Sequence, residues 1–118
     1  MSDEVRPTPR ATPRVLPRAA LDCAVTLTVA GQSKLTCRSV DLSPGGISLL
    51  TPTQLRLAQY CALSFELDSP DGPCLVEAMG QVIYCERAPE RGFRSGVQFL
   101  HLEPSSMAAI TGLLSRAG

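Results

Sequence analysis

Apolar and polar residues alternate along much of the chain from residue 23 onward, which is the pattern of strands with one buried face. In CAVTLTVA, Cys23, Val25, Leu27 and Val29 occupy every second position. Five further strands are predicted in residues 34–43, 46–51, 60–67, 74–86 and 93–100. Six strands in succession predict a small antiparallel β-barrel, because closing a sheet into a barrel removes its exposed edges.

Glycine and proline mark the breaks in this pattern. Pro44 and Gly45 stand at the centre of Ser-Pro-Gly-Gly, between the second and third predicted strands. This pair favours a type II turn, because proline presets the first central φ and glycine tolerates a positive φ at the second. Gly80 interrupts the long fifth run and predicts a bend or bulge that lets this strand curve around the barrel.

Helical spacing replaces the alternation at the end of the chain. Met107, Ile110 and Leu114 recur at intervals of three and four, and Pro104 suits the first turn of a helix. We expect one amphipathic helix over residues 104–116, with these three side chains on its apolar face. The predicted fold class is therefore mainly β: a six-stranded antiparallel β-barrel with a C-terminal α-helix.

The N-terminal segment is rich in proline and arginine instead. It holds four arginines at four-residue intervals: Arg6, Arg10, Arg14 and Arg18. A proline precedes each of the last three and excludes a helix. We expect residues 1–13 to form a flexible arm and residues 14–118 to form the barrel domain with its helix. The whole chain has a formal net charge of zero, so attraction to an anion is local to this basic segment.

Composition argues against several classes of protein. No apolar run is long enough to span a membrane and no signal peptide is evident, so we expect a cytoplasmic protein without membrane insertion. Five cysteines without a C-x-x-C pair argue against a disulfide framework or a zinc site and favour small buried hydrophobes. We expect a structural role for the single histidine, His101. Without a nucleophile–base pair, a metal-ligand cluster or a phosphate-binding glycine pattern, we expect neither an enzyme nor a metal or cofactor site.

Two motifs carry the candidate chemistry. An Arg-x-x-x-Arg step precedes the first strand, and DLSPGG places Asp41, Ser43 and Gly46 in an Asp-x-Ser-x-x-Gly pattern. Together with GQVIYCERAPERGFRSGVQF, they resemble the PilZ family of bacterial cyclic di-GMP receptors over roughly residues 10–116. The resemblance implies a stand-alone PilZ-like barrel that binds cyclic di-GMP. By itself, Asp-x-Ser before two glycines is also a good Asx-turn, in which the side chains only hold the backbone.

The resemblance also selects among the arginines. Family members place the aspartate a little over twenty residues after the second arginine, and Asp41 follows Arg18 by 23 residues. We therefore assign the pair to Arg14 and Arg18, with Arg10 as a helper and with Arg10 and Arg14 as the alternative pair. A guanidinium can fork two donors onto a phosphate or onto guanine O6 and N7.

The same resemblance implies roles for the residues that follow. Asp41, Ser43 and Gly46 form the wall for a guanine, and Gly45 is a secondary candidate. An aspartate accepts from guanine N1–H and the exocyclic amine, a donor pair that no other base presents.

The expected function is a cyclic di-GMP receptor or adaptor that relays the second messenger to an unidentified effector protein, with an output in motility, surface polysaccharide or virulence. The alternative is a ligand-free PilZ-like module for protein–protein interaction. Nucleic-acid binding is not expected, because the arginines come without an aromatic platform: the chain has two Tyr, three Phe and no Trp. We expect a monomer or weak dimer, and the sequence leaves open whether one ligand molecule or a stacked pair is bound.

Overall fold

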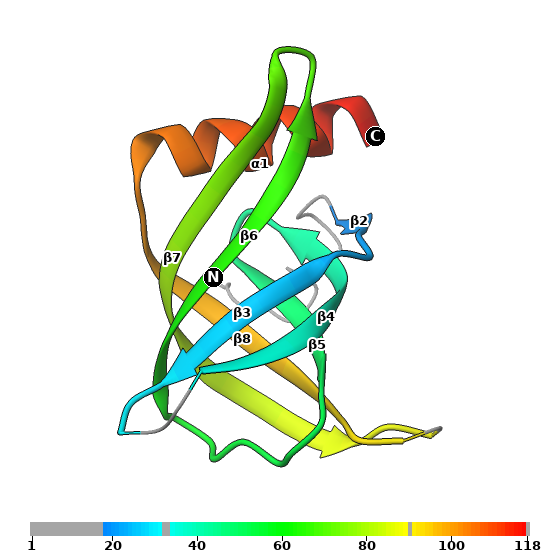
Figure 1. Ribbon diagram of the computed structural model, residues 1–118, viewed down its shortest axis with the longest axis vertical. Coiled ribbons are helices and arrows are strands. Elements are labelled where there is room, and N and C mark those ends of the chain that lie inside the picture. Colours follow the sequence, from blue (N-terminus) through cyan, green and yellow to red (C-terminus); the bar gives the residue numbers. More distant parts are fainter. Residues whose placement is uncertain (1–17, 32–33, 90, 118) are drawn as a thin grey trace, which may run out of the picture.

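The computed structural model describes residues 18–31, 34–89 and 91–117 of the chain. Figure 1 shows a β-barrel with a helix lying across one of its ends. In chain order the elements are β2 (Ala19–Ala20), β3 (Ala24–Val29), β4 (Lys34–Ser43), β5 (Gly46–Thr51), β6 (Tyr60–Ser69), β7 (Gly72–Arg87), β8 (Phe93–Leu102) and α1 (Pro104–Ala117).

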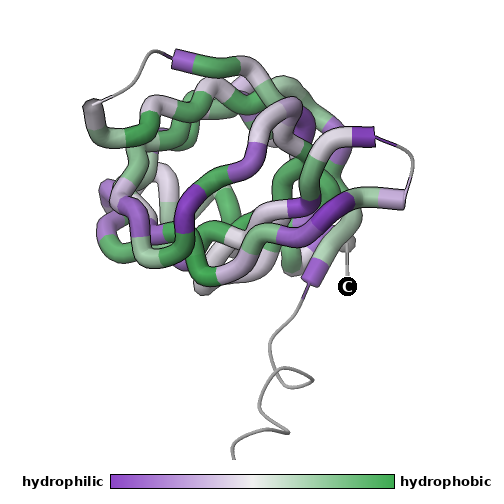
Figure 2. Tube along the Cα trace, turned by 90° about the horizontal axis from the view of Figure 1, so that it is seen from below, coloured by the Kyte–Doolittle hydropathy of each residue, from purple (hydrophilic) through white to green (hydrophobic). Residues whose placement is uncertain are grey.

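Two antiparallel meanders make up the barrel. Strands β3, β4 and β5 pair in succession, as do β6, β7 and β8. Two seams, β3 with β6 and β5 with β8, join the meanders and close the ring that is visible from one end in Figure 2. The predicted six-stranded antiparallel barrel with a C-terminal helix is thus confirmed. The two-residue β2, which pairs with β4, is an additional strand that the alternation did not indicate.

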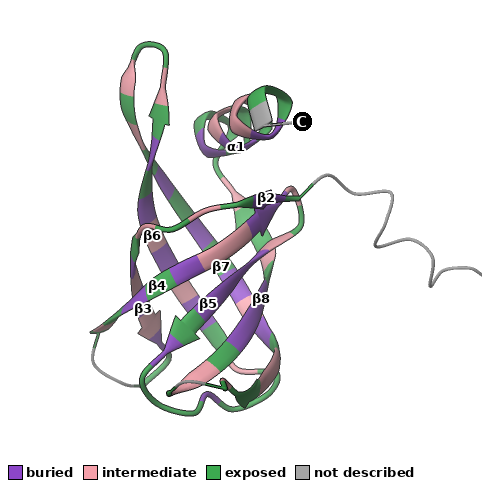
Figure 3. Cartoon of the chain, turned by 90° about the vertical axis from the view of Figure 1, so that its right-hand side faces the viewer, coloured by how far each residue is buried: buried purple, intermediate pink, exposed green. Residues whose placement is uncertain are grey.

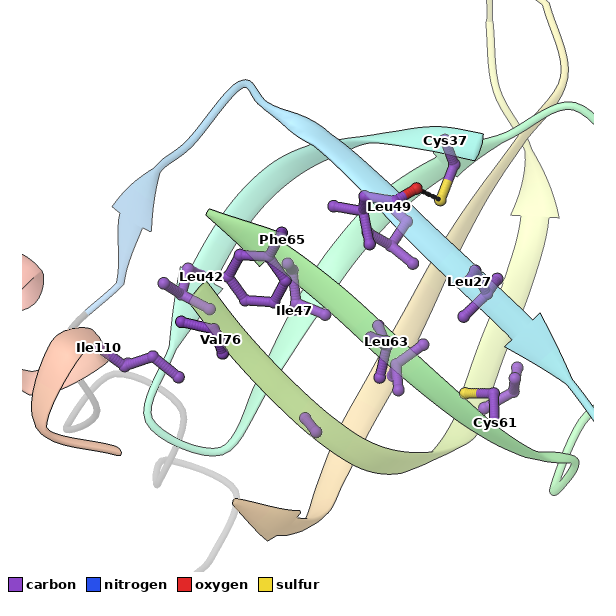
Figure 4. Close-up of a cluster of buried hydrophobic side chains, with 14 of the residues drawn as sticks. Leu27, Cys37, Leu42, Ile47, Leu49, Cys61, Leu63, Phe65, Val76 and Ile110 are labelled. Atoms are coloured by element: carbon purple, nitrogen blue, oxygen red, sulfur yellow. Dashed lines mark hydrogen bonds between the residues drawn. The ribbon is translucent and has the colours of Figure 1, made fainter. Parts of the chain in front are cut away.

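The apolar positions predicted from the alternation form the interior of the barrel (Figure 4). In β3, Val25, Leu27 and Val29 are completely buried, and every second residue of β6 from Cys61 to Leu67 is also buried. Figure 3 shows buried and exposed positions following one another along the strands. Each fully buried aliphatic side chain of this kind stabilises the fold by about 1.5–3 kcal/mol relative to an exposed one.

Helix α1 closes one end of the barrel, and its buried face differs in one position from the predicted face. Ile110 and Leu114 are buried as expected, but Met107 is 42% exposed. The residue that completes the buried face is Ser106, four positions before Ile110, whose hydroxyl accepts a hydrogen bond from the Glu77 backbone N–H at 3.1 Å. Seven residues are nearly two full turns, so Met107 lies on the same side of α1 as Leu114, but it is not buried there. The expectation that Met107 would be buried with Ile110 and Leu114 was wrong.

Gly80 lies at an irregularity between β7 and β8, as predicted. The register shifts between Met79 and Gly80. A Cβ at Gly80 would also stand 2.5 Å from Val97 Cγ1 and 2.8 Å from the Gln98 carbonyl oxygen. The absence of a side chain therefore lets β7 approach β8 closely where the strand curves.

The turn between β4 and β5 is not the expected type II turn. Gly45 does not adopt a positive φ, unlike Gly31, Gly72 and Gly92. Its carbonyl accepts a hydrogen bond from the Phe99 backbone N–H at 2.8 Å, so a contact with β8 takes part in fixing the turn. The local preference of Pro-Gly is overridden by this tertiary contact.

The five cysteines are all free thiols, but only two of them are the buried hydrophobes that we expected. Cys37 and Cys61 are buried, whereas Cys23, Cys74 and Cys85 are half-buried. Cys74 lies in the β6–β7 hairpin, which extends beyond the barrel in Figure 1. Burial raises the pKa of both Cys37 and Cys61 from 9.0 to about 11, and the neighbouring Cys61 and Cys23 add to the rise at Cys37.

These raised pKa values predict a loss of stability at alkaline pH. The folded state holds the two protons more tightly than the unfolded state, so this contribution is complete below pH 9 and is lost as the pH rises through about 11. In urea titrations, the free energy of unfolding should therefore fall more steeply over this range for the intact chain than for the double variant Cys37→Ala, Cys61→Ala. If the free energy of unfolding had the same pH dependence in both proteins, the alkaline loss of stability would not come from Cys37 and Cys61.

The glycines of the β4–β5 turn give a second prediction. A Cβ at Gly46 would collide with the Val97 carbonyl oxygen of β8, whereas a Cβ at Gly45 would meet no atom within 4 Å. Gly46→Ala should lower the free energy of unfolding by about 1–3 kcal/mol, the usual cost of overpacking. Gly45→Ala is the matched control and should change it by less than about 0.5 kcal/mol. Chemical denaturation measures both; equal effects would show that the close approach to β8 is unimportant.

Candidate functional site

A bulge in β4 turns the Asp41 side chain toward the outer face of the barrel. The register between β4 and β5 shifts between Ser39 and Asp41, which leaves Val40 as the extra residue. Before the bulge, Cys37 and Ser39 are buried; after it, Leu42 is completely buried. A regular strand would place residues 37, 39 and 41 on the same face. The bulge therefore takes Asp41 out of the inward series.

Strand β2 brings Arg18 into contact with Asp41. Ala20 pairs with Asp41 and Ala19 with Leu42 along the edge of β4. The Arg18 guanidinium donates through Nη1 to Asp41 Oδ1 at 2.6 Å. The Arg18 side chain is 54% exposed and that of Asp41 is 22% exposed. The result is one guanidinium and one carboxylate side by side on a surface that solvent reaches.

Ser39 holds the segment that leads from β2 into β3. Its buried hydroxyl donates to the Leu21 carbonyl at 2.6 Å and accepts from the Cys23 backbone N–H at 2.9 Å. Leu21 N–H donates to the Val40 carbonyl at 3.0 Å, and Ser39 N–H donates to the Cys23 carbonyl at 3.0 Å. These four bonds tie residues 21–23 to β4 between its pairings with β2 and β3. Sequence reasoning missed Ser39, although a serine in the inward series of β4 was a usable signal.

A second ion pair lies next to this segment. Arg38 donates through Nε and Nη2 to Asp22 Oδ1, at 3.0 and 2.7 Å. Both side chains are exposed, at 53% and 82%. The sequence gave no reason to distinguish Arg38 or Asp22 from other surface charges, because their proximity depends on the β3–β4 register.

The remaining candidates of the Asp-x-Ser-x-x-Gly motif form the hairpin that follows Asp41. Ser43 is 4% exposed, and its hydroxyl donates to the Gly46 carbonyl at 3.4 Å. Gly46 packs against the backbone of β8, while Gly45 is exposed at the tip. In this structure, Ser43 and Gly46 hold the backbone, as in the turn interpretation of the motif.

The motif GQVIYCERAPERGFRSGVQF, on β7 and β8 of the second meander, reaches the same outer surface as Asp41. Cross-strand pairing aligns Asp41 with Ser48, Ser48 with Gly96 and Gly96 with Tyr84. The Tyr84 hydroxyl lies 2.9 Å from Ser48 Oγ, and a Cβ at Gly96 would collide with the Tyr84 ring. The aromatic ring therefore lies against Gly96 and reaches β5. This explains why the glycine of GVQF and the tyrosine of GQVIY belong together.

Other expectations concern parts of the chain beyond this surface. Arg10, Arg14 and the arm at residues 1–13 lie outside the described residues. His101 is exposed and its Nε2 lies 3.1 Å from Glu103 Oε2, so it is a surface residue and not part of the packed interior. In residues 18–31, 34–89 and 91–117, no group of three or more His, Cys, Asp or Glu side chains could hold a metal ion. No helix in these ranges is long and apolar enough to cross a membrane.

Solved structures with the same fold include proteins from three bacteria. The inhibitor of motility from Bacillus subtilis (MotI/DgrA) has a TM-score of 0.77 at 13% identity, over 86% of this chain and 49% of that protein. The PilZ domain of YcgR from Escherichia coli, with c-di-GMP, has a TM-score of 0.63 at 18% identity, over 86% of this chain and 88% of that domain. PlzA from Borreliella burgdorferi, in complex with c-di-GMP, has a TM-score of 0.54 at 17% identity, over 95% of this chain and 41% of that protein. The chain thus spans about half of the Bacillus protein and less of the Borreliella protein.

The sequence comparison agrees with the fold. No curated protein matches the chain. The sequence profile of the PilZ domain, however, matches residues 8–116, which is most of the chain. The protein therefore belongs to the PilZ domain family.

Proposed function

We propose that this chain is a cyclic di-GMP receptor that binds its ligand on the outer face of the barrel, where Arg18 meets Asp41, and relays the second messenger to a partner protein. The observation that carries the proposal is the contact between these two side chains, at 2.6 Å, inside a PilZ domain. PilZ domains are receptor and adaptor domains and not enzymes. Two of the similar structures, from Escherichia coli and Borreliella burgdorferi, contain c-di-GMP.

The two groups match the chemistry of this ligand. Cyclic di-GMP offers two phosphates and two guanines, and a guanidinium binds a phosphate or the O6/N7 edge of guanine with two parallel hydrogen bonds. Lysine lacks this planar fork. The Asp41 carboxylate accepts hydrogen bonds only, and the N1–H and exocyclic amine of guanine supply two donors on one edge.

In the free protein, the ion pair holds Arg18 and Asp41 side by side, and breaking it on ligand binding would cost little free energy. An exposed ion pair contributes only about 0–1 kcal/mol, so a ligand can share or replace the Arg18–Asp41 bond easily. β2 and the Ser39 hydrogen bonds fix the backbone on which the pair stands. The side chains are thus held near their working positions before binding, which lowers the entropy cost of forming the complex.

The other motif residues have less direct roles in this proposal. Ser43 and Gly46 shape the hairpin beside Asp41, and Gly45 leaves its tip open for a base to approach. Arg14 completes the arginine pair, and Arg10 assists; both assignments come from the sequence motif. Binding at this surface would change what the protein presents to an effector, and motility is one candidate output because the Bacillus protein is an inhibitor of motility.

Isothermal titration calorimetry tests the proposal. The intact chain should bind cyclic di-GMP, and Arg18→Ala should weaken binding by about 5- to 150-fold, or roughly 1–3 kcal/mol, because one bidentate contact is lost. Asp41→Asn should weaken it as well, because the amide puts a donor where guanine needs an acceptor. Asp22→Asn is the matched control: Asp22 is another carboxylate paired with an arginine, and its loss should change affinity by less than about twofold.

A thermal melt of each variant separates loss of binding from loss of fold. If the intact chain released no heat with micromolar cyclic di-GMP, the proposal would fail and the ligand-free interaction module would be favoured. An equal loss of affinity in Asp22→Asn and Asp41→Asn would mean that general charge, and not the Arg18–Asp41 contact, governs binding.

A further inference from the structure

Large apolar side chains are concentrated on one outer part of the barrel. In the described part of the chain, eight such side chains are exposed. Six of them lie on β6, β7 and β8 or on the loop before β6. One of the six, Leu75, lies in the β6–β7 hairpin, where it pairs with Glu66. The other five are Leu57 (65% exposed), Tyr60 (58%), Met79 (48%), Ile83 (55%) and Leu100 (52%). We call this set the β7 face.

Strand pairing makes the β7 face continuous. Along β7, Met79 and Ile83 lie on either side of Gln81, which pairs with Tyr60 of β6. On the other side, Leu100 of β8 lies between Phe99 and His101, the partners of Gly80 and Met79. The loop before β6 is tied to the same strand, because Ala58 N–H donates to the Val82 carbonyl at 2.8 Å and Val82 N–H donates to the Gln59 carbonyl at 2.9 Å. Leu57 is therefore close to Ile83.

Two of these side chains are the extra residues of bulges. The β7–β8 register shifts between Val82 and Tyr84, leaving Ile83 as an extra residue in β7, and again opposite Leu100 in β8. Ile83 and Leu100 face outward in the ordinary alternation, and the bulge breaks that alternation after each of them. Ile83 precedes Tyr84, whose ring borders the candidate ligand surface. The β7 face thus begins where that surface ends.

The centre of the β7 face is neutral. The exposed or half-exposed side chains between its apolar members include Ala62, Gln81 and Gln98. Ionisable side chains border it: His101, which pairs with Glu103, is the cross-strand partner of Met79, and Arg56 precedes Leu57. A charged group of a partner would lose hydration at the neutral centre without gaining an opposite charge. At the centre of this face, Gln81 of β7 pairs with Tyr60 of β6 on one side and with Gln98 of β8 on the other, and Gln98 also pairs with Gly46 of β5. Association there therefore uses side chains and not strand addition.

We propose that the β7 face is an interface between two copies of this chain. The chain has a formal net charge of zero, so a second copy meets no net electrostatic repulsion, and an apolar patch can pack against the same patch of a second copy across a two-fold axis. Five half-exposed side chains of this size present roughly 500 Å². Two copies would bury about 1,000 Å², the low end for a specific interface, so the dimer is weak and concentration-dependent.

Sedimentation equilibrium of the full chain without nucleotide tests this proposal. A reducing agent must be present, because Cys23, Cys74 and Cys85 are half-buried thiols that could cross-link copies. A reversible monomer–dimer equilibrium should appear at protein concentrations of about 0.1–1 mM. Ile83→Glu should raise the dissociation constant at least about tenfold, because it brings two like charges together in the interface.

Met107→Glu is the matched control. Met107 is 42% exposed on α1, outside the β7 face, and the substitution should leave the equilibrium unchanged. Leu100→Glu is a second disrupting variant on a different strand, and circular dichroism verifies that all variants are folded. A strictly monomeric intact chain at about 1 mM would overturn the proposal. So would dimerisation that survives both Ile83→Glu and Leu100→Glu, which would place the contact elsewhere or indicate a different partner for this face.

Discussion

Strand β4 has β5 along one edge and, along the other, first β3 and then β2. Backbone groups in such a strand must find partners on both sides, so an extra residue can be accommodated only where both neighbours adjust. At Val40 both neighbours adjust. On one edge, the pairing with β5 shifts by one residue. On the other edge, residues 21–23, which connect β2 to β3, are held by the Ser39 hydroxyl instead of by regular strand pairing. Asp41 faces outward, and Arg18 lies beside it, because of this one irregularity.

The barrel was predictable because buried and outward-facing residues alternate along much of its strands. Val25, Leu27 and Val29, or Cys61 to Leu67, leave a pattern that needs no tertiary information. Predictions failed where a distant contact decided the outcome. The hydrogen bond from Phe99 to Gly45 influences a turn that Pro-Gly alone would have made differently. Met107 and Ser106 are neighbours on α1, and only the position of β7 determines which of them is buried. Ala19 and Ala20 form a strand because β4 has a free edge there.

In the candidate site, too, some features were predictable from the sequence and others depended on tertiary contacts. A spacing of 23 residues, together with the family resemblance, was enough to single out Arg18 and Asp41, and the structure places them in contact. The roles of Ser43 and Gly46 could not be separated from the sequence, because a serine that faces a ligand and one that closes a hairpin occur in the same motif. The Arg38–Asp22 ion pair could not be predicted, because it depends on how β3 pairs with β4. Ser39 stood out only as a serine in the inward series of β4, and its hydrogen-bond partners Leu21 and Cys23 lie in a separate segment. Tyr84 and Gly96 were found as motif residues, but their mutual contact required the β7–β8 pairing.

The division of the barrel into two meanders has a consequence for how the chain folds. Within each meander, successive strands are joined by short connections, so pairing closes small loops and costs little chain entropy. The seams join distant residues instead: Thr26 pairs with Ser64, and Gly46 pairs with Gln98. Such long-range pairing is slow, because the entropy of a long loop must be lost before the contacts form. Arg18 and Asp41 both belong to the part of the chain that precedes β6. Their contact therefore needs only the first meander and β2, and not the two seams. The Tyr84–Ser48 contact spans the β5–β8 seam and must wait for the ring to close.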